Sequence, residues 1–420
     1  MRKSPEYLSD PGQVYDVAIV GAGPTGSSLA LAAVKAGLSV ALIDGRPAVG
    51  SAPLKRDTRN FAIVRGSWRL LTRLGVTETL TTDAEPLLGL EAEDGSGHIL
   101  GAPAALFGTD DLDATDDEIP LGYMVQAEPL QAALDAAVNA KAASEGLAVM
   151  RPTRFAGYTV EGETAIVSLE DDTPIRTRLL VGCDGVNSPV RAAAGIGTEG
   201  RDYGKSVFAA NVKLSHPHGG IARQLFMPEG PFATLPLPGD RANLAWYLKR
   251  GAAEVLAECS TEEQEAELNA RFADFAGEMK IDGPVLAYPL KLIIAQDMVG
   301  SRVALVGDAA RRINPLAGQG LNLGFKDVAA LAEVMADMVR AGLDPGSAIA
   351  LERYSRWRRW DATITALGMD AIDRVFSNGN PLLKAGRSLA LMAADRLGGV
   401  RSALTKQASA DQPGLPELMR

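Results

Sequence analysis

The chain has 420 residues, 46% of them hydrophobic and 22% charged, a composition typical of a globular protein with a large core and two or three domains. Its formal net charge of −10 argues against a nucleic-acid partner, which normally meets a basic surface. The two cysteines and three histidines are not spaced as metal ligands, so we expect no metal site. Because the N-terminus lacks the apolar core of a signal peptide and no apolar run reaches about 18 residues, we expect a cytoplasmic protein without a membrane span.

The first elements in the chain predict a βαβ unit. Residues 15–20 (YDVAIV) form a β-branched apolar run that is typical of a buried parallel strand. Residues 27–36 predict a helix, which ends where Gly37 supplies a C-terminal cap. Residues 39–44 (SVALID) predict a second buried strand, and its last residue is an acid.

The turn between the first strand and the helix has the sequence GAGPTG. Gly21 permits a tight turn, Gly23 lets a pyrophosphate approach the backbone, and Gly26 lets the helix pack closely on the strand. The helix N-terminus offers free N–H groups to phosphates, and Asp44 stands where a carboxylate binds a ribose hydroxyl. The alternative is a structural turn without a ligand, but three glycines carry a conformational cost that such a turn does not need. The unit therefore predicts dinucleotide binding and leaves open which dinucleotide is bound.

Two later stretches repeat the pattern of a strand that ends in an aspartate. Residues 177–195 predict a strand running into Asp184-Gly185, followed by a helix with Ser188 as its cap and Pro189 at its first position. Residues 300–339 predict a strand ending in Gly307-Asp308, a glycine-rich turn and a long helix. Each stretch alone is also compatible with an ordinary turn.

Together the three stretches resemble the group A flavoprotein aromatic monooxygenases, which share the fold of p-hydroxybenzoate hydroxylase. The motifs that carry this resemblance are GAGPTG, CDGVNSPVR and GDAARRINPLAGQGLNLG, and it covers nearly the whole chain. A narrower resemblance, to the ubiquinone-biosynthesis hydroxylases, is carried by residues 57–76, 124–134 and the C-terminal ALTKQASADQPGLPELM.

The resemblance implies that FAD is the dinucleotide and that NAD(P)H is a co-substrate without a domain of its own. Relatives often carry Glu where this chain has Asp44, so Arg46 is expected to assist at the adenosine ribose. Relatives also read Gly-Gly-Gln-Gly where this chain has Ala317-Gly318-Gln319-Gly320. The residues that the resemblance places at the cofactor are Gly21, Gly23, Pro24, Thr25, Gly26, Asp44, Arg46, Arg59, Gln126, Asp184, Gly185, Asp308, Pro315, Gly318, Gly320, Leu321 and Asn322.

The implied activity is hydroxylation of the aromatic ring of a polyprenylated ubiquinone precursor, with NAD(P)H and O2, via a flavin hydroperoxide. Three alternatives stay open: hydroxylation of a soluble phenol or polyketide, a non-catalytic FAD-binding scaffold in a biosynthetic complex, and a reductase on the same fold. The sequence offers no Ser-His-Asp set or paired carboxylate, so no catalytic residue is assigned.

The expected fold class is α/β, with a Rossmann-like FAD-binding domain (13–83, 120–194 and 288–345) interleaved with a mostly antiparallel substrate domain (84–119 and 195–287). A C-terminal helical region is expected at 346–410. Within it, residues 380–407 combine a leucine-rich face with basic side chains, typical of a core helix or of a peripheral membrane contact. A homo-oligomer or a ubiquinone-biosynthesis complex is also compatible with the resemblance. The basic side chains are Lys384, Arg387, Arg396, Arg401 and Lys406.

Overall fold

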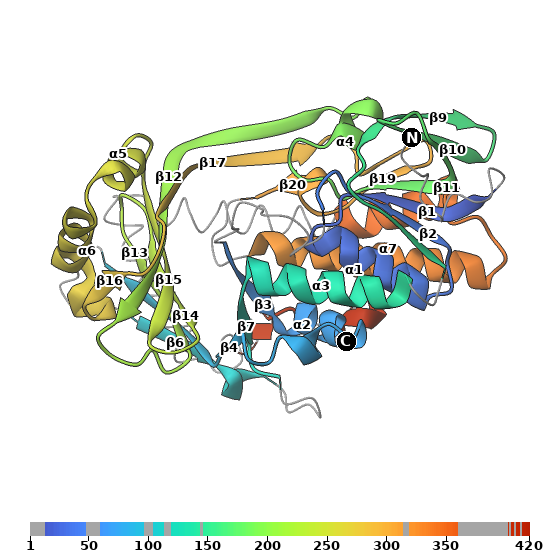
Figure 1. Cartoon of the computed structure of the whole chain (residues 1–420). Coiled ribbons are helices and arrows are strands. Elements are labelled where there is room, and N and C mark those ends of the chain that lie inside the picture. The colour runs from blue at the N-terminus through green and yellow to red at the C-terminus, as the bar shows by residue number, and fades with distance from the viewer. Residues whose placement is uncertain are drawn as a thin grey trace.

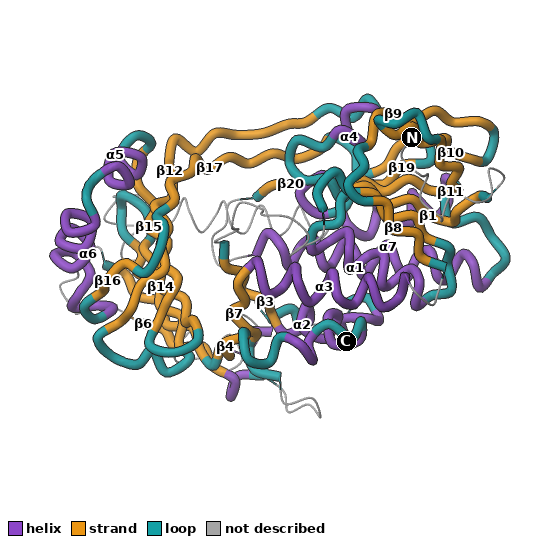
Figure 2. The backbone as a smooth tube through the Cα atoms, viewed as in Figure 1, coloured by secondary structure: helices purple, strands orange, loops and turns teal. Residues whose placement is uncertain are grey.

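The computed structural model describes residues 13–47, 59–95, 104–112, 119–142, 146–313 and 319–359, together with 402, 405–406, 409–411 and 414–420. Within these residues the strands form sheets of eight, nine and three strands. Helices pack under the eight-stranded sheet at one end of the molecule, and the nine-stranded sheet occupies the other end (Figures 1 and 2). The predicted fold class is thereby confirmed.

The eight-stranded sheet contains the predicted βαβ unit. β1 pairs in parallel with β2 on one side and with β11 on the other, and its central residues are fully buried. The order is β18-β19-β11-β1-β2-β8, and β10 and β9 continue antiparallel from β11. The bounds are β1 (Val14–Val20), β2 (Val40–Ile43), β8 (Leu147–Met150), β9 (Phe155–Glu161), β10 (Thr164–Leu169), β11 (Pro174–Gly182), β18 (Val299–Gly300) and β19 (Val303–Leu305).

Three helices cover one face of this sheet. α1 (Pro24–Lys35) packs against both α3 (Ala127–Ala142) and α7 (Gln319–Arg340) (Figure 1). α1 begins three residues before the predicted helix because a proline, with its fixed φ, suits the first helical position. Its buried side chains are mostly Ala, Ser and Leu, and the small ones allow close approach of the neighbouring helices.

The nine-stranded sheet is mostly antiparallel, as predicted for the second part. Its order is β20-β17-β12-β15-β14-β13-β5-β6, with β16 beside β12. β12 has 17 residues and runs beside β17 from the first sheet towards the far end of the molecule (Figure 1). The bounds are β5 (Gly89–Asp94), β6 (Ala104–Gly108), β12 (Thr198–Leu214), β13 (Ile221–Phe226), β14 (Phe232–Leu237), β15 (Arg241–Lys249), β16 (Met279–Ile281), β17 (Leu286–Ala295) and β20 (Arg311–Arg312).

Two helices cover the outer face of the nine-stranded sheet, α5 (Ala252–Glu258) and α6 (Thr261–Ala276) (Figure 1). Phe272 of α6 stacks on Phe232 of β14, with ring centroids 3.8 Å apart, and meets Trp246 of β15 edge to face. This second apolar core is separate from the one beneath the eight-stranded sheet.

A three-stranded sheet, in the order β3-β7-β4, lies near α2 and the C-terminus. Asp411 pairs with Arg69 of α2 at 2.8 Å, so the end of the chain is fastened to this region. The elements not yet delimited are β3 (Asn60–Val64), α2 (Arg65–Arg73), η2 (Thr77–Thr79), β4 (Ala84–Leu87), η3 (Thr109–Asp111), β7 (Gly122–Gln126), α4 (Pro189–Ala193), η4 (Gly307–Ala309) and η6 (Glu417–Met419).

The predicted domain limits remain a prediction. The limit near residue 195 falls just before β12, whereas β4, which the prediction assigned to the second domain, pairs with β7. Of the predicted C-terminal helical region, residues 348–359 form a helix, and residues 360–401 lie outside the described residues.

Candidate functional site

A cavity of about 1370 Å³ lies where the two parts of the molecule meet. One end is formed by the GAGPTG turn, by the loop after β2 and by residues around β9. The other end is formed by the inner strands of the nine-stranded sheet, including Ala210 of β12 and Tyr288 of β17. The cavity therefore joins a nucleotide-binding turn to an antiparallel sheet.

The GAGPTG turn has the geometry that its glycines predict. Gly21 has φ +99°, a conformation that strongly favours glycine. A Cβ on Gly26 would lie 1.8 Å from the carbonyl oxygen of Gly21, so no side chain fits at the contact between helix and turn. A Cβ on Gly23 would meet only the Arg46 guanidinium, at 3.9 Å. The backbone at Gly23 is thus open to the cavity, as close approach of a phosphate requires.

The N-terminus of α1 points its free amides into this region. Its N-cap is Gly23, which offers no side chain to cap the first turn. First-turn amides have no partner within a helix, and the positive end of the helix dipole lies there. An anion bound at this turn would accept hydrogen bonds from the free amides and would interact favourably with the helix dipole.

Thr25 brings three distant segments together. A Cβ on Gly324 of α7 would lie 2.6 Å from the Thr25 methyl carbon, and a Cβ on Gly307 would lie 3.0 Å from it. Both glycines leave room for Thr25, so the first turn of α1 packs against α7 and the Gly307-Asp308 corner. Gly324 was not among the predicted site residues.

Asp44 lines the cavity and also stabilises the GAGPTG turn through hydrogen bonds. Its Oδ2 accepts a hydrogen bond from the Ala22 amide at 2.6 Å, and its Oδ1 accepts one from the Arg46 amide at 2.7 Å. The Arg46 side chain is two-thirds exposed and reaches back towards the same carboxylate. Asp44 thus holds the turn and the end of β2 in register.

Asp184 presents an unused acceptor. Its Oδ2 accepts from the Val190 amide at 3.0 Å, while its Oδ1 is buried and has no hydrogen-bond partner in the described part of the chain. Burial raises the pKa of Asp184, against the opposing effect of hydrogen bonds from Ser188 and Val190 and of the Arg191 charge. Ser188 caps α4 as predicted, accepting from the Arg191 amide at 2.9 Å.

Asp308 also faces the cavity. Its side chain is exposed to the cavity although protein surrounds it, and burial raises its pKa while Arg312, Arg59 and Arg311 oppose the rise. The preceding residue, Gly307, has φ +64°. This corner turns the carboxylate away from the sheet and into the cavity.

The backbone under Asp308 is held by a buried ionic network. Asp327 of α7 accepts from the Gly307 amide at 3.0 Å through Oδ2. Its Oδ1 accepts from Arg311 at 2.5 Å and from Arg358 at 2.7 Å. Asp327 is fully buried, so the two guanidiniums compensate its charge where water cannot.

The sheet end of the cavity carries a cluster of three amides. The Asn211 side-chain oxygen accepts from Asn60 Nδ2 at 2.9 Å and from Asn243 Nδ2 at 3.1 Å. These residues lie on β12, β3 and β15, so the cluster fastens the three-stranded sheet to the nine-stranded one. Tyr288, Arg312 and Arg59, whose guanidinium lies over the Phe61 ring, complete this wall.

The structure brings most of the predicted residues to one cavity. Those that line it are Gly21, Gly23, Pro24, Thr25, Asp44, Arg46, Arg59, Asp184, Gly185, Asp308, Gly320 and Leu321. Pro315 and Gly318 lie outside the described residues.

Three predicted residues lie off the cavity wall. Gly26 is buried behind the turn. Asn322 is buried and bonds the backbone of β3, accepting from the Val64 amide at 3.1 Å and donating to the Ala62 carbonyl at 2.7 Å. Gln126 ends β7, and Gln131 lines the cavity instead, donating to the Ala22 carbonyl at 2.9 Å.

The amide cluster, Tyr288, Arg312 and Asp327 were missed from the sequence. Asn211 interrupts the apolar run of residues 207–212 and Asn243 that of residues 242–248, and a polar residue at such a position is the signal that could have drawn attention to them.

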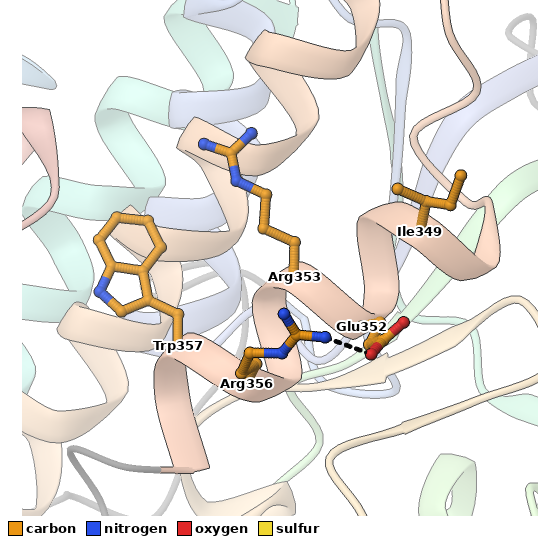
Figure 3. Close-up of a pocket in the computed structure, with 5 residues that line it drawn as sticks. All are labelled: Ile349, Glu352, Arg353, Arg356 and Trp357. Atoms are coloured by element: carbon orange, nitrogen blue, oxygen red, sulfur yellow. Dashed lines mark hydrogen bonds and ion pairs between the residues drawn. The ribbon is translucent and has the colours of Figure 1, made fainter.

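A second, smaller cleft of about 500 Å³ lies on the helix at residues 348–359. Figure 3 shows its five lining residues, with Arg356 paired to Glu352 and with Trp357 one turn along from Arg353. Arg353 also pairs with Asp337 of α7 at 2.6 Å. Its arginines are therefore matched by local acids, and none of the predicted cofactor residues lines it.

Comparisons with known proteins support the assignment of the larger cavity as a dinucleotide-binding site. Residues 14–363 match the protein family described as "FAD binding domain". The class defined by this match and by the glycine turn is that of FAD-binding proteins.

Relatives narrow this class. The chain is 35% identical to "Ubiquinone hydroxylase UbiL" of Rhodospirillum rubrum over 411 residues, which covers 97% of this chain and 93% of the relative. It is 34% identical to "3-demethoxyubiquinol 3-hydroxylase" of Escherichia coli, covering 94% of this chain and 98% of the relative. The structure of p-nitrophenol 4-monooxygenase PnpA from Pseudomonas putida superposes with a TM-score of 0.76 at 18% identity, covering 96% and 99% of the two chains.

The chain therefore belongs to the FAD-dependent aromatic monooxygenases, in the group that contains the ubiquinone-biosynthesis hydroxylases. Enzymes of this family bind FAD and take electrons from NAD(P)H. Among the described residues no helix is long and apolar enough to cross a membrane, and no three His, Cys, Asp or Glu side chains are grouped as metal ligands.

Proposed function

We propose that this enzyme hydroxylates the aromatic ring of a polyprenylated ubiquinone precursor, with NAD(P)H and O2 as co-substrates. Two relatives whose matches each cover more than nine-tenths of this chain, a ubiquinone hydroxylase and a demethoxyubiquinol hydroxylase, support this substrate class. The observation that carries the proposal is the single cavity joining the nucleotide turn to the antiparallel sheet. A cofactor and an aromatic ring can meet in such a space.

The described residues fit FAD on chemical grounds. The open backbone at Gly23 and the uncapped N-terminus of α1 suit a pyrophosphate. The buried, unused Oδ1 of Asp184 and the cavity-facing carboxylate of Asp308 can accept bonds from hydroxyl donors of the ribityl chain and ribose. We assign Asp44 and Arg46 to the adenosine ribose. Asp44 already accepts two backbone bonds, and each carboxylate oxygen keeps a second acceptor site.

We assign the remaining predicted residues to the ring end of the cofactor. Gly320 lies at the start of α7, and a Cβ there would meet no atom within 4 Å, so a flat ring can approach its backbone. The positive end of the α7 dipole would favour negative charge on that ring. Arg59 and Leu321 also line the cavity, and our proposal includes Pro315 and Gly318 from the sequence alone.

Bound FAD supplies the chemistry that reduces and activates O2 for transfer to the ring. The chain itself places the ring, keeps water out and holds charge near the reacting atoms. Apolar residues such as Ala209, Ala210 and Leu286 of the nine-stranded sheet line the substrate side. Because an apolar wall hydrates poorly, it would protect reactive oxygen from loss to solvent.

We also propose a peripheral contact with the inner membrane and with partners of ubiquinone biosynthesis. The polyprenyl tail of such a substrate partitions into lipid, and residues 380–407 have the basic and leucine-rich pattern of an interfacial helix. Most of this segment lies outside the described residues, so the proposal is supported by sequence pattern and substrate chemistry.

The test is mass spectrometry of quinone intermediates in a strain that lacks this gene, beside the purified enzyme offered prenylated and simple phenols. We expect one precursor lacking a ring hydroxyl to accumulate, and product formation only from the prenylated phenol. Normal quinone levels in the deletion strain, or coupled hydroxylation of soluble phenols alone, would contradict the proposed substrate.

A further inference from the structure

The carbonyl group of Ala22, inside the GAGPTG turn, accepts hydrogen bonds from three side chains. Ser27 Oγ donates to it at 3.0 Å, Gln131 Nε2 at 2.9 Å and Arg151 Nη2 at 3.2 Å. The amide of the same residue donates to Asp44 Oδ2 at 2.6 Å. Both polar groups of Ala22 are bonded, so the orientation of the peptide planes on either side of it is fixed as well.

Gln131 and Arg151 reach the turn from two different elements. Gln131 lies on α3, one turn before Asp135, and donates to its Oδ1 at 3.0 Å. Arg151 follows β8, which pairs with β2, and its Nη1 donates to the same Oδ1 at 2.9 Å. The Arg151 and Asp135 side chains are both less than one-tenth exposed. The aspartate therefore compensates the guanidinium charge and holds both donors at Ala22.

The bonds to Ala22 also fix the direction of the next amide. The Ala22–Gly23 peptide bond is trans, and in a trans peptide the carbonyl and amide groups point in opposite directions. The donors on the Ala22 carbonyl thus keep the Gly23 N–H pointing away from them. Gly23 lines the cavity, and in the described part of the chain its amide donates no hydrogen bond. This amide is a preorganised donor for an anion in the cavity.

We propose that Arg151, together with Gln131, is a positioning residue for the pyrophosphate of FAD. The two side chains bond the Ala22 carbonyl and so orient the Gly23 amide towards the phosphate. Among the described residues, Gln131 lines the cavity and Arg151 does not, so Arg151 acts through the turn and not by touching the ligand. The inference rests on the proposed placement of the pyrophosphate at Gly23, and it is independent of which aromatic substrate the enzyme uses.

The experiment compares two probes, ADP and adenosine, which differ by the two phosphates. Each is titrated into flavin-free, full-length protein by calorimetry, and the rate of FAD release is measured on dilution of the holoenzyme. If Arg151 orients a phosphate-binding amide, its removal changes the affinity for ADP and leaves the affinity for adenosine unchanged. A general loss of cavity structure would weaken the binding of both probes.

In Arg151→Met we expect ADP binding to weaken about three- to tenfold, the value of one hydrogen bond, with adenosine binding unchanged. FAD release should become faster by a similar factor. Gln131→Met should weaken ADP binding to a similar extent, because it removes a second donor from the same carbonyl. The double variant should weaken ADP binding at least about tenfold.

Two controls separate the orientation of the amide from charge and from stability. Arg151→Met combined with Asp135→Asn removes both charges of the pair, so the net charge stays the same and the loss of ADP affinity should persist. Arg302→Met is the matched control for stability. Arg302 also donates to a backbone carbonyl, that of Arg178 at 3.1 Å, and pairs with Asp344, but it is not among the described residues that line the cavity. Its ADP affinity should equal that of the wild type.

Four results would overturn the inference. The first is an unchanged ADP affinity in Arg151→Met, which would leave Gln131 at most a direct contact. The second is an equal loss of adenosine affinity. The third is recovery of ADP affinity when Asp135→Asn is added, which would make the effect one of charge. The fourth is a wild type that binds no ADP, which would remove the pyrophosphate from Gly23. Hydroxylation of prenylphenol is measured separately, so its absence would contradict the proposed function and leave these binding results standing.

Discussion

The buried aspartate beneath the Gly307-Asp308 corner offers the sharpest stability test. Asp327→Asn keeps the shape of the side chain and removes its charge. The native carboxylate bonds Arg311 at 2.5 Å, Arg358 at 2.7 Å and the Gly307 amide at 3.0 Å. The substitution removes the carboxylate that pairs with two almost fully buried guanidiniums.

The magnitude follows from the burial of the pair. Removing one partner of a buried ion pair costs about 3–5 kcal/mol, because the remaining charge is left in a medium of low dielectric. An unfolding entropy of about 2.1 cal/mol/K per residue, taken over the whole chain, converts this to a fall in Tm of roughly 3–6 °C. Since Asp327 also holds the Gly307 amide, FAD affinity should fall as well.

Asp337→Asn is the matched control on the same helix. Asp337 pairs with Arg340 and Arg353, both at 2.6 Å, but all three side chains are partly exposed. Exposed pairs contribute about 0–1 kcal/mol, so its Tm should fall by no more than about 1 °C. Thermal melts followed by intrinsic fluorescence give both values. Equal shifts for the two variants would refute the reasoning from burial.

Three further substitutions test the cavity. Gly26→Ala places a Cβ 1.8 Å from the Gly21 carbonyl oxygen, so FAD affinity, measured by fluorescence titration, should fall at least about a hundredfold. Gly157→Ala is the control: its Cβ meets no atom within 4 Å, so FAD affinity should not change. Asp308→Asn should weaken FAD binding about 10- to 150-fold, the value of one charge-assisted hydrogen bond. Because burial raises the pKa of Asp308 in the folded state, its ionised form costs stability above that raised pKa. The FAD-free Asn variant should therefore melt higher than wild type at pH 7, and this gain should shrink as pH falls towards the ordinary aspartate value; a constant difference across pH would contradict it. Asn211→Leu removes the oxygen that accepts from Asn60 and Asn243 and disrupts this wall of the cavity, so the KM for the aromatic substrate should rise about 5- to 100-fold with FAD content intact. An unchanged KM would argue against a substrate-side role for the cluster.

The local parts of the site could be predicted because they depend on short stretches of chain. A glycine with φ +99° at the end of β1, and a glycine without room for a Cβ at the contact between helix and turn, follow from the spacing in GAGPTG. The three aspartate corners were likewise visible, since each acid directly follows or lies close to the end of a buried strand.

The remaining parts depend on pairing across long sequence separations. Asn211 meets Asn243 because β12 pairs with β15, and meets Asn60 because two sheets touch. From the sequence alone, Asp327 is an ordinary polar residue on an amphipathic helix. Only the fold shows that Arg358, 31 residues away in the chain, donates a hydrogen bond to it. Sequence spacing alone does not reveal such contacts.

The central claim is that three separate glycine-and-aspartate corners bind one FAD. Titrating FAD into flavin-free wild-type protein, followed by flavin fluorescence, tests this claim most directly. The account predicts saturable binding of one FAD per chain, with Asp184→Ala and Asp308→Ala each weakening it. Folded protein that takes up no flavin, or that binds it with the same affinity in both variants as in wild type, would contradict the account.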